Sequence, residues 1–134
     1  MKISAKSQYG LRAMVYLAKN PDKVCSLKLI AQEENIPFDY LEKIVSKLEK
    51  ANLVKSKKGS LGGYFLEKGP REVTLGEIIT AVEEKSAMIR CAQEQEDCYC
   101  SDAANCSTKI FWQQIQDSFA AVVNSKTLSD LIEK

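Results

Sequence analysis

The chain has 134 residues, of which 45% are hydrophobic, with 19 basic and 18 acidic side chains and no histidine. No stretch approaches the ~20 apolar residues of a membrane span, and the start MKISAKSQYG lacks the apolar region of a signal peptide, so we expect a cytoplasmic protein with no membrane partner. Without histidine there is no His-based acid–base catalysis, no usual catalytic triad and no histidine metal ligand, and we expect no enzyme.

The small net charge conceals an uneven distribution. Residues 1–70 contain 13 Lys and Arg against 7 Asp and Glu, whereas residues 71–134 contain 6 against 11. The first part therefore carries +6 and the second −5, which together give the net charge of +1. This asymmetry indicates that only the first part of the chain meets a polyanion.

The first fifty residues predict three helices. Apolar residues at helical spacing mark residues 4–18, and Ser26 caps a short second helix. A turn at residues 35–37 leads into a third helix that reaches about Ala51. Its predicted buried face consists of Leu41, Ile44, Val45 and Leu48. Two helices joined by a tight turn are typical of a helix-turn-helix.

A cationic hairpin is predicted to follow the third helix. Residues 53–54 and 64–66 predict two short strands. The segment between them contains Lys55, Lys57 and Lys58 together with Gly59, Gly62 and Gly63. The glycines permit a sharp reversal and the lysines make its tip positive, as in the wing of a winged helix.

The remainder of the chain predicts helices on both sides of a polar segment. Thr74 and Glu77 form a capping box that opens one helix. Residues 86–106 are acidic, cysteine-rich and without period, so they predict a loop. A long helix begins at Ser107 or Thr108 and carries an apolar stripe of Phe111, Ile115, Phe119 and Val122. This stripe is too apolar for a free helix in so small a protein, so we place it at the two-fold interface of a homodimer.

The third helix and the wing supply candidate contacts to double-stranded DNA. An α-helix fits the major groove, and a lysine-tipped hairpin can follow the phosphates or enter the minor groove. Glu42 could accept a hydrogen bond from a cytosine amino group. Asp39, Lys43 and Ser46 are the other exposed candidates on the helix, and Lys57 and Lys58 are those on the wing. The alternative is a small helical domain whose charged hairpin binds nothing.

Four of the five cysteines, Cys91, Cys98, Cys100 and Cys106, fall within 16 residues. In a reducing compartment such clustering indicates metal ligation or redox chemistry rather than disulfides. Thiolates suit iron–sulfur clusters and zinc, but the paired knuckles of structural zinc sites are missing from this spacing, and clusters tolerate irregular spacing. A zinc-stabilised module and free thiols are the alternatives. The fifth, Cys25, is predicted to be a buried small residue.

These motifs together resemble the IscR/NsrR family of winged-helix regulators, which repress or activate genes according to an iron–sulfur cluster. The matching stretches are ISAKSQYGLRAM, IPFDYLEKIVSKLEKANLVKSKKGSLGGYFL, TLGEIITAVEE and, after the cysteines and an aromatic helix, TLSDLIE. The resemblance covers nearly the whole chain. It implies a mainly α fold, a winged helix-turn-helix with a two-stranded wing and a long carboxyl-terminal dimerisation helix.

The resemblance also implies which residues contact DNA. The family inserts its third helix into the major groove, which corresponds to Pro37, Asp39 and Glu42, and its wing arginine corresponds to Lys58. The complete predicted DNA-binding set is Pro37, Asp39, Tyr40, Glu42, Lys43, Ser46, Lys57 and Lys58.

The family's three-cysteine ligand pattern maps best onto Cys91, Cys100 and Cys106. The fourth ligand departs from the family, because IscR-like members have a histidine where this chain has Lys109 and NsrR-like members have an acid where it has Gln8. Cys98 is then an extra thiol in a longer loop, or it replaces Cys100. The fourth ligand is Cys98, a water or exogenous ligand, or another residue. The expected cofactor is a 2Fe–2S cluster, with 4Fe–4S as the alternative.

The implied function is a transcriptional regulator that senses cluster or redox status and controls iron–sulfur assembly genes. A nitric-oxide-sensing repressor with a 4Fe–4S cluster is the main alternative, and a small iron–sulfur electron carrier is the alternative from another class. The family's cysteine-metabolism repressor, which has no cluster, lacks this cysteine set. The predicted organisation is a DNA-binding domain at 1–84, a cluster-binding loop at 85–106, and the dimerisation helix with a last helix at 107–134.

Overall fold

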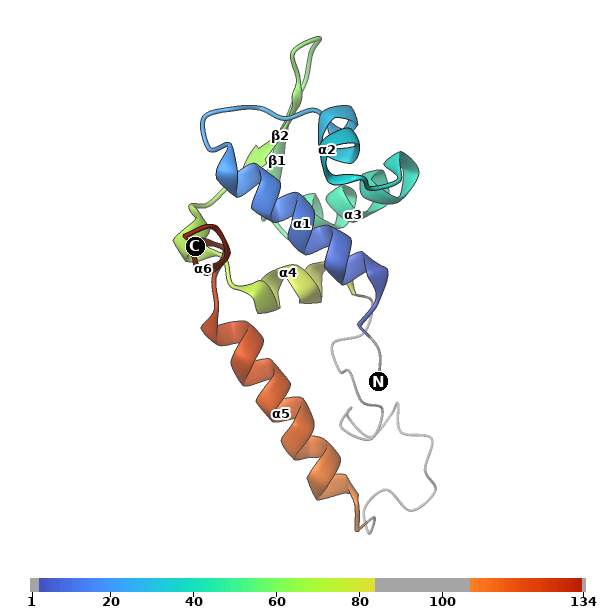
Figure 1. Ribbon diagram of the computed structural model, residues 1–134, viewed down its shortest axis with the longest axis vertical. Helices are drawn as coiled ribbons and strands as arrows, with labels where there is room; N and C mark the ends of the chain where they lie inside the picture. Colours follow the sequence, from blue (N-terminus) through green and yellow to red (C-terminus); the bar gives the residue numbers. More distant parts are fainter. Residues whose placement is uncertain (1–2, 84–106, 134) are drawn as a thin grey trace.

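A helical domain with a projecting hairpin and one long outlying helix forms the molecule (Figure 1). The computed structural model describes residues 3–83 and 107–133. In chain order the elements are α1 (Ala5–Lys19), α2 (Leu27–Glu34), α3 (Phe38–Lys50), β1 (Val54–Lys57), β2 (Gly63–Leu66), a 3-10 turn η1 (Pro70–Glu72), α4 (Leu75–Val82), α5 (Lys109–Ser125) and α6 (Leu128–Ile132). The predicted mainly α winged helix-turn-helix with a long carboxyl-terminal helix is confirmed.

The core lies where α1, α3 and α4 cross. The four residues predicted for the buried face of α3 are at most 2% exposed, as the helical period required. They pack in one cluster with Met14 and Leu17 of α1, Ile30 of α2 and Ile78 of α4. Burial of these side chains is the main force that holds the three helices at fixed angles.

Local signals explain the helix-turn-helix. The Ser26 hydroxyl accepts a hydrogen bond from the Leu29 amide at 3.2 Å and caps α2, as predicted. Asn35 ends α2 in the left-handed conformation, with φ of 55°. Ile36 is then buried at 3% exposure, and Pro37 precedes the first turn of α3. The turn is therefore short and fixed at both ends.

The wing is an antiparallel pair with Val54 opposite Leu66 and Lys57 opposite Gly63. Lys55 and Lys57 lie within strand β1, so the prediction that put them in the connecting segment is wrong; the strands continue because cross-strand hydrogen bonds extend past the apolar residues. At the base, the Tyr64 amide donates to the Cys25 carbonyl at 2.8 Å and the Cys25 amide donates to the Tyr64 carbonyl at 2.9 Å. A Cβ at Gly63 would lie 2.3 Å from that Cys25 oxygen, so only glycine permits this approach. The Cys25 side chain is buried, as predicted.

The carboxyl-terminal elements return the chain to the core. The capping box predicted at Thr74 is present, and a second capping box opens α6 at Thr127. The Leu75 amide donates to the Lys126 carbonyl at 2.9 Å and the Leu128 amide donates to the Val73 carbonyl at 3.0 Å, which ties α6 to the start of α4. Leu128 is fully buried in the same core, whereas α5 extends away from the helical domain (Figure 1). Across residues 3–83 and 107–133 no helix is both long and apolar enough to cross a membrane.

Candidate nucleic-acid interface

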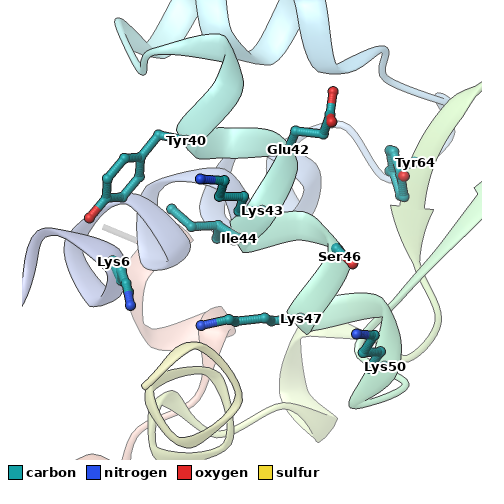
Figure 2. Close-up of a pocket in the computed structure, with 9 residues that line it drawn as sticks. All are labelled: Lys6, Tyr40, Glu42, Lys43, Ile44, Ser46, Lys47, Lys50 and Tyr64. Carbon is teal, nitrogen blue, oxygen red and sulfur yellow. The ribbon is translucent and has the colours of Figure 1, made fainter. Parts of the chain in front are cut away.

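An open groove of about 770 Å³ runs along the exposed side of α3 (Figure 2). Three elements line it: α3 provides most of the residues, α1 provides one lysine and β2 provides one tyrosine. The residues that line it, here called the lysine groove, are Lys6, Tyr40, Glu42, Lys43, Ile44, Ser46, Lys47, Lys50 and Tyr64. Of the predicted DNA-binding residues, the structure brings Tyr40, Glu42, Lys43 and Ser46 together here.

Positive charge dominates the lysine groove. Lys43, Lys47 and Lys50 follow one another at intervals of four and three residues, which places them on one face of α3. Lys6 joins them from α1, on the same side of the helix (Figure 2). Four ammonium groups against the single carboxylate of Glu42 make this surface attractive to phosphates.

Four residues of the lysine groove were not predicted from the sequence: Lys6, Lys47, Lys50 and Tyr64. The helical spacing from Lys43 was a usable signal for Lys47 and Lys50. No local signal existed for Lys6 and Tyr64, because they reach the groove only through the crossing of α1 and the hairpin with α3. Pro37 and Asp39 are exposed at the start of α3 but lie outside the groove lining.

Two tyrosines border the groove. The ring of Tyr40 packs edge-on against Tyr9 of α1, with centroids 5.4 Å apart, and this contact fixes the start of α3 against α1. Burial raises the pKa of Tyr64, and the nearby carboxylates of Glu49 and Glu42 raise it further. Tyr64 is therefore a neutral phenol at pH 7 and can donate a hydrogen bond.

The wing presents a second cationic surface. Lys57 and Lys58 are exposed at the end of β1 and the following turn, and in the part of the chain that the structure describes no acid lies within ion-pair distance of either. Lys55 on the same strand differs, because its ammonium lies 3.2 Å from the Glu67 carboxylate. The hairpin projects beyond α2 and α3 (Figure 1), so its tip can reach a ligand that lies along α3.

The predicted dimer stripe lies on a helix that buries none of its residues within one chain. Phe111 and Val122 are 53% and 61% exposed, and Ile110, which was not predicted to belong to the stripe, is 72% exposed. Ile115 and Phe119 are half-buried. Phe119 lines a small cavity of about 80 Å³ together with residues of α4, so part of the stripe faces the chain's own helical domain.

The predicted metal ligands Cys91, Cys98, Cys100 and Cys106 lie outside the described residues. Within residues 3–83 and 107–133, no group of three or more cysteine, aspartate or glutamate side chains is arranged to hold a metal ion.

Comparisons with known proteins agree with this fold. The family model Rrf2, described as iron-dependent transcriptional regulator, matches residues 3–134. The HTH-type transcriptional regulator CymR of Bacillus subtilis is 39% identical over 132 residues, covering 98% of this chain and 89% of CymR. Among solved structures, T. potens IscR superposes with a TM-score of 0.80 at 34% identity, covering 99% of this chain and 87% of that one. CymR, titled the global cysteine regulator of B. subtilis, gives 0.79 at 38% identity, covering 98% and 95%.

These matches confirm the predicted resemblance and the prediction of a transcriptional regulator. They include both IscR and CymR at similar identity, so similarity alone does not separate the two types. With a family model that spans nearly all of its residues and relatives above 30% identity over nearly its full length, this chain belongs to the Rrf2 family of transcriptional regulators.

Proposed function

We propose that this protein is a cytoplasmic homodimer that binds operator DNA through α3 and the wing and is controlled by an iron–sulfur cluster. The lysine groove carries the first part of the proposal. It places four ammonium groups around the exposed face of a helix that the fold presents as a recognition helix. Glu42 and Ser46 stand among those lysines, so phosphate contacts would orient the helix while these two side chains read base edges.

The wing and α5 complete the DNA-binding unit in this proposal. Lys57 and Lys58 contact phosphates or the minor groove, and Pro37, Asp39 and Tyr40 lie at the end of α3 that enters the major groove. Residues 1–84 form the DNA-binding domain, and the exposed apolar residues of α5 pair two chains. Dimerisation would then set two copies of α3 about one DNA turn, or a multiple, apart.

The cluster proposal depends on the donor set of residues 85–106. Cys91, Cys100 and Cys106 would each bind iron, with Cys98 as the fourth ligand or a bystander. Four thiols within 16 residues of a chain without histidine suit iron–sulfur ligation by softness and number. The bound cluster would supply a centre whose loading or oxidation state changes with iron, sulfide and oxidants. We further propose that the cluster is of the 2Fe–2S type and that the regulated genes are those of iron–sulfur assembly.

The similarity to CymR favours a second candidate. CymR is named the global cysteine regulator of its organism, and it is as similar to this chain as IscR is. In that case the protein would regulate transcription without a cluster, and its four clustered thiols would be free.

Anaerobic purification separates the two candidates. We expect wild-type protein to contain iron and acid-labile sulfide and to show visible absorption. Single serine substitutions at Cys91, Cys100 and Cys106 should abolish all three signals. Cys25→Ala is the matched control, because Cys25 is buried at the base of the wing and should leave the cluster intact.

The Cys98 variant distinguishes two forms of the site. Retention of the cluster in Cys98→Ser means that three thiolates hold it, with one iron position open to an exogenous ligand. Loss of the cluster means a site of four thiolates. Wild-type protein that contains only zinc, or no metal, would contradict the cluster proposal and favour the CymR-like candidate.

A further inference from the structure

The carboxyl end of α4 is attached to both α1 and α3 at two consecutive residues. Val82, the last residue of α4, is fully buried, and its carbonyl accepts a hydrogen bond from the Lys47 ammonium of α3 at 3.5 Å. Glu83 follows, and its carboxylate accepts a hydrogen bond from the Ser7 hydroxyl of α1 at 2.6 Å and another from the Ser4 hydroxyl. We call these five residues the α4-end junction.

Close packing supports the junction from within the core. A Cβ built on Gly10 of α1 would lie 3.2 Å from Val82 Cγ1 and 3.7 Å from Ile44 Cγ2. Glycine at this position therefore allows α1, α3 and α4 to meet around the Val82 side chain. The side chain and the carbonyl of the same residue thus contact the recognition helix and its neighbour at one point.

The hydroxyl and carboxylate groups of the junction are hydrogen-bonded to one another. Ser7 is only 1% exposed, and a buried hydroxyl without a partner would cost free energy, so its bond to Glu83 is needed. Burial alone would raise the pKa of Glu83, but the hydrogen bonds from Ser4 and Ser7 and the nearby Lys6 ammonium lower it below the ordinary value. The carboxylate is therefore ionised at neutral pH and accepts charge-assisted hydrogen bonds.

Lys47 connects the α4-end junction to the lysine groove. Its side chain lines the lysine groove and also donates to the end of α4, so the position of α4 and the position of the groove are coupled. Glu83 is also the last described residue before the segment that contains the four clustered cysteines.

We propose that Glu83, with Ser4, Ser7 and Lys47, holds α3 at the angle that base recognition requires, and is the point through which the segment after residue 83 acts on α3. These are positioning residues, since only Lys47 lines the groove. The inference rests on the proposed DNA-binding function. Loss of the Glu83 carboxylate should therefore affect selective binding, which needs α3 in register, more than binding to any duplex, which needs only charge.

The test compares Glu83→Ala and Ser7→Ala with Glu77→Ala. Ser7→Ala removes a single hydroxyl and serves if Glu83→Ala fails to fold. Glu77→Ala is the matched control, because Glu77 caps the other end of α4 through the Thr74 amide at 2.8 Å and has no part in the junction. Full-length protein is measured in each case, against a duplex selected by the wild type from a random pool and against an unrelated duplex of equal length.

Three readouts decide the proposal. We expect the ratio of selected to unrelated affinity to fall about tenfold in the junction variants, comparable to one mismatched base pair. Amide hydrogen exchange should accelerate in α3 and in the first turn of α1. In protein that carries a cluster, the change in affinity on removing the cluster should shrink in Glu83→Ala. The Glu77→Ala protein should match the wild type in all three.

The following results would contradict the proposal. If both junction variants keep the wild-type affinity ratio and exchange rates, or if Glu77→Ala alters them as much, the proposal is wrong. An unchanged response to cluster removal in Glu83→Ala would overturn the transmitting role. If the wild type selects no duplex, the proposed function has failed, and hydrogen exchange alone decides whether the junction holds α3.

Discussion

Replacing Lys57 and Lys58 together with alanine should weaken binding to every DNA sequence and make it less sensitive to salt. Both ammonium groups are exposed, and no acid among the described residues neutralises them. Their full charge is therefore available to phosphates. Because binding of a phosphate releases condensed counterions, each contact contributes about 0.9 to the slope of log affinity against log salt concentration.

The size of the effect follows from that slope. Loss of two contacts should lower the magnitude of the slope by up to ~2. At about 0.1 M salt, relative to a 1 M reference, the two contacts together contribute up to ~60-fold in affinity, which the double variant would lose. The loss should be nearly the same for selected and unrelated duplexes, since phosphates carry no sequence information.

Fluorescence anisotropy titrations over a range of salt concentrations measure the slope directly. Lys55→Ala is the matched control, because Lys55 lies on the same strand but is paired with Glu67 at 3.2 Å. Its slope should stay close to that of the wild type. An unchanged slope in the double variant, or an equal reduction in Lys55→Ala, would remove the wing tip from the interface.

Three further outcomes are expected. Glu42→Ala should change which duplexes are preferred without a uniform loss of affinity, because Glu42 lies in the lysine groove among the phosphate-binding groups; identical relative affinities across a set of duplexes would show that Glu42 reads no bases. Ile115→Asp and Val122→Asp should give monomers in sedimentation velocity, and Val122, 61% exposed in one chain, should do so without unfolding; a folded Val122→Asp dimer would place the interface elsewhere. Because the pKa of Glu83 is lowered on folding, its carboxylate stabilises the fold above the unfolded pKa of ~4.3, and this stabilisation is lost as pH falls through the lower folded pKa. In urea titrations, the difference in unfolding free energy between wild type and Glu83→Gln should therefore be constant near neutral pH and shrink below about pH 4.

Local sequence was sufficient for the elements of this fold. The caps at Ser26, Thr74 and Thr127 are formed by residues three positions apart, so the chain determines them without help from distant parts. The apolar period of α3 likewise determined which face is buried, because its apolar side chains are removed from water only when that one face packs against the core. The lysines and glycines between the two apolar segments predicted the wing, although its strands extend further than the apolar residues alone indicated.

The functional surfaces needed the tertiary structure. Lys6 lies 34 or more positions from the groove residues of α3, and it reaches them only because α1 crosses α3. The pairing of Lys55 with Glu67, which leaves Lys57 and Lys58 as the unneutralised lysines of the wing, depends on the hairpin register. Ser7 and Glu83 are 76 positions apart and meet only where α1 packs against α4. Helical periodicity determines which residues share a face, but the angles at which helices cross are set by packing in the core, and those angles decide which distant charges and hydroxyls meet.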